Sequence, residues 1–250
     1  MDLPPLGSLA RSVALLRAFG HEQSDPARFY SFLAADSVRQ VASYADLTGA
    51  VLLDVGGGPG FFAEAFRAHG ARYLGLDADA GELSLHGRTV GADTVLGSAL
   101  ALPFADGVVD VCYSSNVLEH VAEPYRMAEE MVRVTRPGGL VFLSYNNWLA
   151  PNGGHETAPW HYLGGRYAAD RYTRRTGHRP KNDYGSSLYR TSVAQMLRWT
   201  RRGGVDVVAA FPRYHPRWAH GVVRLPGLRE VLTWNLALVL RRQGGPDRDT

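Results

Sequence analysis

The chain has 250 residues, of which 45% are hydrophobic, and its formal net charge is +3. This length is enough to bury one sizeable core, and no stretch reaches the ~20 apolar residues of a membrane span. The single cysteine, Cys112, excludes an intrachain disulfide, and the N-terminus lacks the profile of a signal peptide. We therefore expect a cytoplasmic protein with no stable membrane insertion, and its charge pattern is not typical of nucleic-acid binding.

Two helical patterns precede the first predicted strand. Apolar residues recur at helical spacing from Ser8 to Phe19, and Asp25-Pro26 is an N-cap followed by a proline, a common helix start. The second helix is predicted to run to Tyr44. Because both helices come before the sheet, we expect an N-terminal helical cap that can cover a ligand crevice.

From residue 50 onward, short apolar runs alternate with helical patterns. Strands are predicted at 51–55, 71–76, 93–96, 108–113, 140–145, 205–211 and 234–240. Helices are predicted at 60–69, 79–87, 166–176 and 192–202, and one more begins at Val117 and ends before Pro137. This alternation predicts an α/β, Rossmann-like, doubly wound fold with a parallel sheet covered on both faces. Ligands bind such sheets at the carboxyl ends of the strands.

A glycine turn follows the first strand. Asp54 is followed by Gly56, Gly58 and Gly60 at every second position, and an apolar helical pattern comes next. Glycines allow positive φ and close approach of a ligand, and the following helix start favours a polar group. The spacing differs from the dinucleotide fingerprint G-x-G-x-x-G, and the preceding carboxylate disfavours a pyrophosphate. The turn therefore suits a cationic ligand, or one that presents hydroxyl and ammonium groups.

A second aspartate, Asp77, ends the second predicted strand. A carboxylate at this position can accept hydrogen bonds from both hydroxyls of a ribose. The alternative is a turn or N-cap aspartate, because Asp77-Ala78-Asp79 could begin the next helix.

At this point the chain resembles the class I S-adenosylmethionine-dependent methyltransferases, in particular the small-molecule group often called type 11. The resembling segments are LDVGGGPGFF (53–62), LGLDAD (74–79), GSALALPFADGVVDVCYSSNVLEHV (97–121) and RVTRPGGLVFLS (133–144). The resemblance implies a sheet of seven strands, six parallel and one antiparallel, with a helical and loop cap. It also implies S-adenosyl-L-methionine as cofactor, S-adenosyl-L-homocysteine as product, and a small-molecule acceptor.

The resemblance assigns cofactor-binding roles by position. Asp54, with the backbone at Gly56, Gly57, Gly58 and Gly60, would hold the amino acid part, and Asp77 would hold the ribose. Ala78, Ser98 and Ala99 would lie around the adenine, and Ser114 and Asn116 would close the crevice near the methionine portion. Ser98 departs from the family, in which an aspartate commonly accepts the adenine amino group.

We expect a single methyltransferase domain with five segments. These are the N-terminal helical cap (1–48), the cofactor-binding core (49–147), an acceptor-binding cap insertion (148–203), the last two strands (204–241) and a flexible tail (242–250).

The long segment after the fifth predicted strand is polar and aromatic, as functional lids often are. A base helps when the methyl acceptor is a hydroxyl, and histidine takes a proton near neutral pH. The candidates are His155, Glu156 and His161 in this segment, and His120 in the LEHV motif. We expect His155 or His161 to be the base, with Glu156 orienting one of them. The alternatives are a polar surface loop for these three residues and helix packing for His120.

The aromatic and guanidinium groups of the cap suit a polar acceptor. We therefore predict O-methylation of a small metabolite, such as a saccharide or glycolipid intermediate. N- or C-methylation and a non-catalytic cofactor-binding regulator are alternatives, and the glycine spacing argues against a nicotinamide-dependent oxidoreductase.

No metal is predicted, and ligation by His155, Glu156 and His161 is a lesser alternative because their spacing is not the i, i+4 of a helical zinc site. The high Ala, Arg and Gly content suggests a bacterial source, and no pattern indicates an oligomeric state.

Overall fold

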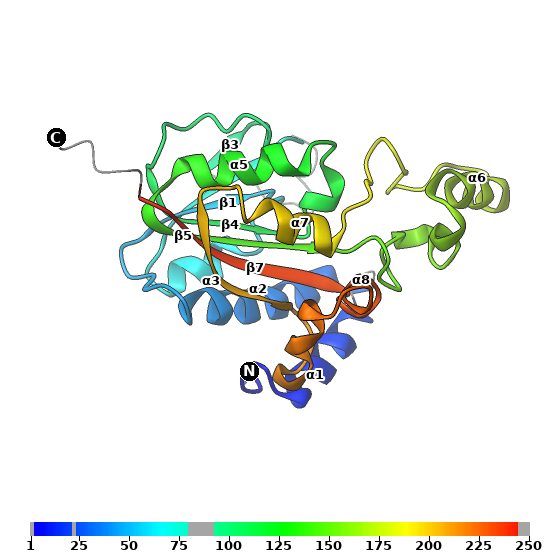
Figure 1. The fold of residues 1–250 in the computed structure, drawn as a ribbon, viewed down its shortest axis with the longest axis horizontal. Helices are drawn as coiled ribbons and strands as arrows, with labels where there is room; N and C mark the ends of the chain where they lie inside the picture. Colours follow the sequence, from blue (N-terminus) through cyan, green and yellow to red (C-terminus); the bar gives the residue numbers. More distant parts are fainter. Residues whose placement is uncertain (1–2, 22–23, 80–92, 245–250) are drawn as a thin grey trace.

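The computed structural model describes residues 3–21, 24–79 and 93–244. At its centre lies a seven-stranded sheet with the order β3-β2-β1-β4-β5-β7-β6 (Figure 1). The strands are β1 (Val51–Val55), β2 (Arg72–Asp77), β3 (Thr94–Leu96), β4 (Val109–Ser115), β5 (Thr135–Asn146), β6 (Val205–Pro212) and β7 (Asn235–Arg242). Strands β1 to β5 pair in parallel, and β7 is antiparallel to both of its neighbours. The predicted seven-stranded, mostly parallel sheet is confirmed.

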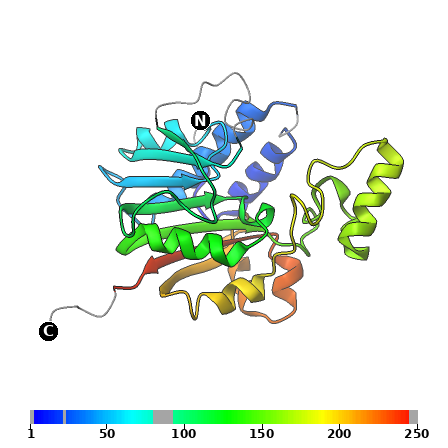
Figure 2. The ribbon, with the colours of Figure 1, turned by 90° about the horizontal axis from the view of Figure 1, so that it is seen from above.

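Helices cover both faces of this sheet (Figures 1 and 2). Met127 and Met131 of α5 lie in the core on one face, and Val38 of α2 and Phe66 of α3 lie in the core on the other. The α-helices are α1 (Leu9–Phe19), α2 (Pro26–Ala42), α3 (Ala63–Ala68), α5 (Pro124–Val134), α6 (Gly165–Thr176), α7 (Val193–Trp199) and α8 (Leu228–Leu232). The short 3₁₀ helices are η2 (Leu118–His120), η3 (His155–Thr157), η4 (Trp160–Leu163) and η5 (Arg217–Arg224).

The N-terminal helices begin where the capping residues predict. The Ser8 side chain accepts a hydrogen bond from the Arg11 amide at 3.1 Å, and the Asp25 side chain accepts one from the Arg28 amide at 3.2 Å. Helix α2 starts at Pro26 and ends at Ala42, two residues before its predicted end. A side-chain oxygen at the N-cap satisfies one of the free amides of the first turn, so these two starts are encoded locally.

The single helix predicted from Val117 to Pro137 is wrong. The structure contains the one-turn helix η2 and, after a break, the separate helix α5, which begins at Pro124. Proline lacks an amide hydrogen and disfavours a helical conformation in the preceding residue, here Glu123. The chain therefore leaves the helical conformation between His120 and Pro124.

Several element boundaries also differ from prediction. Strand β5 begins at Thr135 instead of residue 140, because Thr135 already pairs with Val109 of β4, with a register shift before the next pair. Helix α3 begins at Ala63 because Gly60, at φ 77°, is not helical. Helix α7 ends at Trp199, three residues earlier than predicted. The helix predicted at 79–87 and most of the tail predicted at 242–250 lie outside the described residues.

The segment that follows β5 contains η3, η4 and α6. Figures 1 and 2 show α6 standing apart from the sheet, beyond the end to which β5 leads. This is the carboxyl end of the parallel strands, where a doubly wound sheet binds its ligands. Across the described ranges, none of the helices is both long and apolar enough to cross a membrane.

Candidate active site

The glycine turn after β1 adopts backbone conformations that favour glycine. Gly56, Gly58 and Gly60 have φ values of 80°, 49° and 77°, which lie in the left-handed region. A Cβ on Gly56 would overlap the side chain of Val117, which immediately precedes η2. The turn therefore lies directly against the chain segment that follows β4.

Asp54 lies behind the turn and is 2% exposed. Its Oδ2 accepts a 2.8 Å hydrogen bond from the Tyr73 hydroxyl of β2. Burial raises the pKa of Asp54 to about 7, although the hydrogen bond from Tyr73 lowers it, and the nearby Asp77 raises it further. The carboxyl group is thus poised to change charge near neutral pH. Tyr73 was not predicted as a site residue, because in the sequence it is only an aromatic residue within an apolar strand.

Asp77 joins the end of β2 to the glycine turn. Its Oδ2 accepts a hydrogen bond from the Gly58 amide at 2.9 Å, and its Oδ1 accepts one from the Asp79 amide at 3.0 Å. The second bond is the turn geometry that the sequence offered as an alternative to ribose binding. The carboxylate nevertheless remains only partly buried, and Ala78 beside it is exposed.

The other predicted adenine and methionine contacts differ in accessibility. Ser98 is exposed after β3, where its hydroxyl accepts a hydrogen bond from the Leu100 amide at 3.1 Å, and Ala99 beside it is partly buried. Ser114, by contrast, is fully buried, and its hydroxyl donates a 2.8 Å hydrogen bond to the Val55 carbonyl. The Ser114 hydroxyl therefore ties β4 to the end of β1.

Asn116 follows β4 in an uncommon conformation. Its φ is 58°, and His155 is the other non-glycine residue with positive φ in the described ranges. The Asn116 amide donates a 2.8 Å hydrogen bond to the Ser144 carbonyl of β5, and its side-chain Oδ1 accepts one of 2.7 Å from Asn235. Such conformations concentrate at functional sites and persist when surrounding contacts hold them. Both residues lie where the strands meet the cap.

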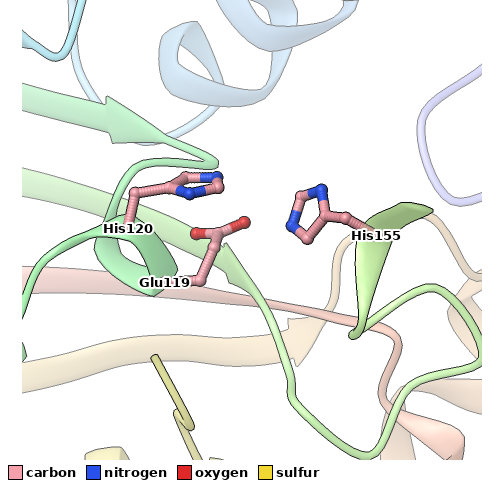
Figure 3. A group of neighbouring side chains, drawn as sticks. All are labelled: Glu119, His120 and His155. Carbon is pink, nitrogen blue, oxygen red and sulfur yellow. The ribbon is translucent and has the colours of Figure 1, made fainter. Parts of the chain in front are cut away.

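A cluster of three ionisable side chains forms at this same end of the sheet. Glu119 and His120 come from η2, and His155 comes from η3 of the cap; their side chains point toward one another (Figure 3). One nitrogen or oxygen of each residue lies within 4.8 Å of those of the other two. The ring centroids of His120 and His155 are 5.1 Å apart. We call these three residues the Glu-His-His cluster.

Hydrogen bonds hold the cluster from outside and leave its inner atoms unpaired. The Oε1 of Glu119 accepts a 3.0 Å hydrogen bond from the Asn146 amide at the end of β5. The Nδ1 of His120 lies 2.7 Å from the Ser187 carbonyl, so Nδ1 donates and Nε2 keeps a lone pair. The Oε2 of Glu119 and the Nε2 of His155 are buried and have no partner within the described structure.

Burial also shifts the protonation equilibria of the cluster. It raises the pKa of Glu119, while the adjacent His120 opposes this shift. Burial and then the charge of His120 lower the pKa of His155 to about 4, against a smaller opposing effect of Glu156. His155 is therefore neutral near pH 7.

The other two candidate base residues lie outside the cluster. His161 is 1% exposed; its Nε2 lies 3.2 Å from the Ala150 carbonyl, and its ring packs on Trp148 and Tyr162. The exposed Glu156 accepts a 3.0 Å hydrogen bond from the Asn182 side chain. These contacts are those of residues that hold the cap together. The structure thus brings together His120 and His155, with Glu119 as the carboxylate beside them.

Glu119 was not among the site residues predicted from the sequence. Neighbouring residues point about 100° apart around an α-helix and about 120° apart around a 3₁₀ helix, so helical spacing does not group Glu119 with His120. In the structure the two side chains nevertheless approach each other and the ring of His155, which comes from the cap (Figure 3). The signal for Glu119 in the sequence is its position directly before His120, a candidate base, shortly after a predicted strand.

The chain as a whole is similar to known methyltransferases. Residues 53–143 match a family model described as a methyltransferase domain. The chain is 57% identical over 245 residues to an uncharacterized methyltransferase of Mycolicibacterium gilvum, covering 94% of this chain and 95% of that one. It is 52% identical over 248 residues to another from Mycobacteroides abscessus, with the same coverage. The chain belongs to the S-adenosylmethionine-dependent methyltransferases. The crystal structure of such a methyltransferase from Mesorhizobium loti has the same fold, with a TM-score of 0.59, 23% identity, and coverage of 83% of this chain and 98% of that one.

The strand ends of this methyltransferase fit the family's cofactor. A Cβ on Gly58 would meet no atom within 4 Å, so the turn is open on that side to a closely approaching ligand. The Asp77 carboxylate lies at the rim of the turn, and the buried Asp54 lies beneath it. A sulfonium and an ammonium group carry positive charge, which these two carboxylates would stabilise. The individual cofactor contacts assigned from the sequence remain predictions.

Proposed function

We propose that this methyltransferase methylates a hydroxyl oxygen of a small polar metabolite, such as a saccharide or glycolipid intermediate. S-Adenosylmethionine, when bound, supplies a methyl group activated by the sulfonium. The glycine turn with Asp54 would hold its amino acid part, and Asp77 would hold its ribose. The protein's remaining tasks are to orient the acceptor, to exclude water and to receive a proton.

The observation that carries this proposal is the Glu-His-His cluster. A hydroxyl loses its proton as it is methylated, so an O-methyltransferase benefits from a nearby group that can accept hydrogen bonds or protons. Glu119 Oε2 and His155 Nε2 are such groups, because both are buried and unpartnered. Val117, which packs on the glycine turn, is two residues before Glu119, so the cluster lies next to the cofactor end of the crevice. His120 and His155 are therefore our candidates for direct contact with the acceptor.

The cap supports a polar acceptor. Trp160 and Tyr167 leave 39% and 43% of their surfaces exposed, and the Arg171 guanidinium lies 4.0 Å from the centre of the Trp160 ring. Aromatic faces beside guanidinium donors suit the mixed apolar and hydroxyl surface of a sugar. We propose that segment 148–203 is the acceptor-binding cap.

A methyl-transfer assay tests the proposal. The protein would be incubated with labelled S-adenosylmethionine and matched sets of hydroxyl, amine and carbon acceptors, and the methylated atom would be identified by NMR spectroscopy. We expect O-methyl products. Transfer to amines or carbon acceptors alone would contradict O-methylation, and tight cofactor binding without transfer to any extract component would favour a regulatory protein.

A further inference from the structure

The Glu-His-His cluster has the composition of a metal site. Two imidazoles and one carboxylate are the protein ligands of many catalytic zinc centres, and similar sets hold other divalent transition metals. Magnesium instead prefers oxygen ligands, of which the cluster has only one carboxylate. The residues present thus favour a zinc-like ion over magnesium.

The arrangement of lone pairs favours a cation at this place. Glu119 is 1% exposed, and its Oε2 is buried without a hydrogen-bond partner within the described residues, as is the Nε2 of His155. A buried acceptor without a donor costs free energy, and this cost is removed when a cation binds. His120 donates a hydrogen bond from Nδ1 to a carbonyl, which leaves the lone pair of its Nε2 available to a metal ion.

The surroundings resemble the outer shell of a metal centre. Metal-binding histidines usually donate their second ring nitrogen to a carbonyl or carboxylate, and ligating carboxylates are themselves hydrogen-bonded. In this protein the Ser187 carbonyl accepts the hydrogen bond from Nδ1 of His120, and the Asn146 amide donates one to the Glu119 carboxylate. These two contacts fix the orientation of both side chains before any ion binds.

The spacing requires only a small closure. The ligand atoms lie within 4.8 Å of one another. Ligands at about 2.1 Å from a tetrahedral ion lie about 3.4 Å apart, so an inward shift of roughly 1 Å completes the site. His155 can supply this shift because it belongs to the cap, whereas Glu119 and His120 follow directly from the sheet.

We propose that Glu119, His120 and His155 bind one divalent transition metal ion of the zinc type, with an open position toward the methyl acceptor. A bound divalent ion lowers the pKa of a hydroxyl that contacts it. In this catalytic role the inference rests on the proposed O-methylation, whereas binding of the ion does not.

Titration with Co²⁺ tests the site without any methyl transfer. Untagged full-length protein would be stripped with a chelator, dialysed and titrated while visible absorption is recorded, because Co²⁺ held by imidazole and carboxylate ligands absorbs in this range. We expect one equivalent to bind and Zn²⁺ to displace it. His155→Gln and Glu119→Gln should each weaken binding at least tenfold, and the exposed His69→Gln should leave it unchanged.

Circular dichroism would establish that each variant is folded, and His155→Gln alone tests the site if Glu119→Gln does not fold. Absence of cobalt absorption in the wild-type protein, or equal binding by His155→Gln, would overturn the metal site. O-Methylation that persists in excess chelator would overturn its catalytic role alone. If the protein binds cobalt but methylates only amine or carbon acceptors, the metal site is supported and the proposed O-methylation is contradicted.

Discussion

The hydroxyl of Tyr73 donates a hydrogen bond to the buried carboxyl of Asp54, directly beneath the glycine turn. This pair sets the charge of the cofactor end of the crevice, because the pKa of Asp54 is raised to about 7. The carboxyl group is neutral below this pH and ionised above it.

We expect the affinity for S-adenosylmethionine to depend on this ionisation. A cationic ligand favours the charged carboxylate, so the dissociation constant should fall by up to about tenfold per pH unit as pH rises toward 7, and then level off. Isothermal titration calorimetry from about pH 5.5 to 8.5 would measure this. Asp54→Asn should bind more weakly with a flatter pH profile, and an equally steep profile in that variant would show that another group titrates.

Tyr73→Phe should destabilise the fold in a pH-dependent way. The hydrogen bond from Tyr73 favours the ionised form of Asp54, so its loss should cost about 1–3 kcal/mol above pH 7 and less at pH 5 to 6, where the carboxyl group is protonated. In the wild-type protein the raised pKa means that the folded state holds the Asp54 proton more tightly than the unfolded chain does, so its stability falls as pH rises from about 4 to 7. In Tyr73→Phe this fall should be larger, because the ionised carboxylate has lost its hydrogen bond. Urea unfolding at two pH values measures the difference, and equal costs at both would contradict it.

Gly56→Ala should impair both folding and cofactor binding. The new Cβ would overlap the side chain of Val117, and the turn would force the alanine to adopt a φ of 80°. Together these two effects should cost on the order of 2–4 kcal/mol. Gly204→Ala is the matched control, because Gly204 also has positive φ but nothing within 4 Å of its Cβ position. Thermal unfolding should show a clearly smaller loss for that variant. Adding Val117→Ala should recover part of the Gly56→Ala loss, and strict additivity in this cycle would rule out the clash.

The buried ion pair between α1 and α2 gives a test of the N-terminal helices. Arg11 and Asp36 pair at 2.7 Å, with side chains 4% and 1% exposed. Arg11→Met leaves the Asp36 carboxylate buried without its cation, with only the hydrogen bond from Gln40, and should cost about 3–5 kcal/mol. Arg11→Met with Asp36→Leu should cost much less. The exposed pair Arg67–Asp93 serves as control, and Arg67→Gln should change stability by no more than about 1 kcal/mol. Denaturant unfolding compares them, and a double variant as unstable as Arg11→Met would argue against this explanation.

The features that the sequence predicts correctly are encoded by neighbouring residues. The starts of α1 and α2 follow from Ser8 and from Asp25-Pro26, because a cap bonds within its own first turn. The glycine turn follows from Asp54 and the alternate glycines, since positive φ is a property of single residues. Strand β1 likewise has its predicted bounds, because a buried strand is a short apolar run ended by a turn.

The composition of the candidate site was decided by the tertiary structure. Glu119 and His155 are far apart in the sequence, and they meet because the segment that follows β5 brings η3 to the side chains of η2. No local pattern distinguishes His155, which joins the cluster, from His161, which packs inside the cap. The sequence alone therefore determined the fold class and the family, because both are recorded in local patterns, namely the alternation of strands and helices and the motifs around the glycine turn. Only the tertiary structure decided which side chains share the acceptor end, because that depends on long-range packing, which burial enforces and sequence spacing does not record.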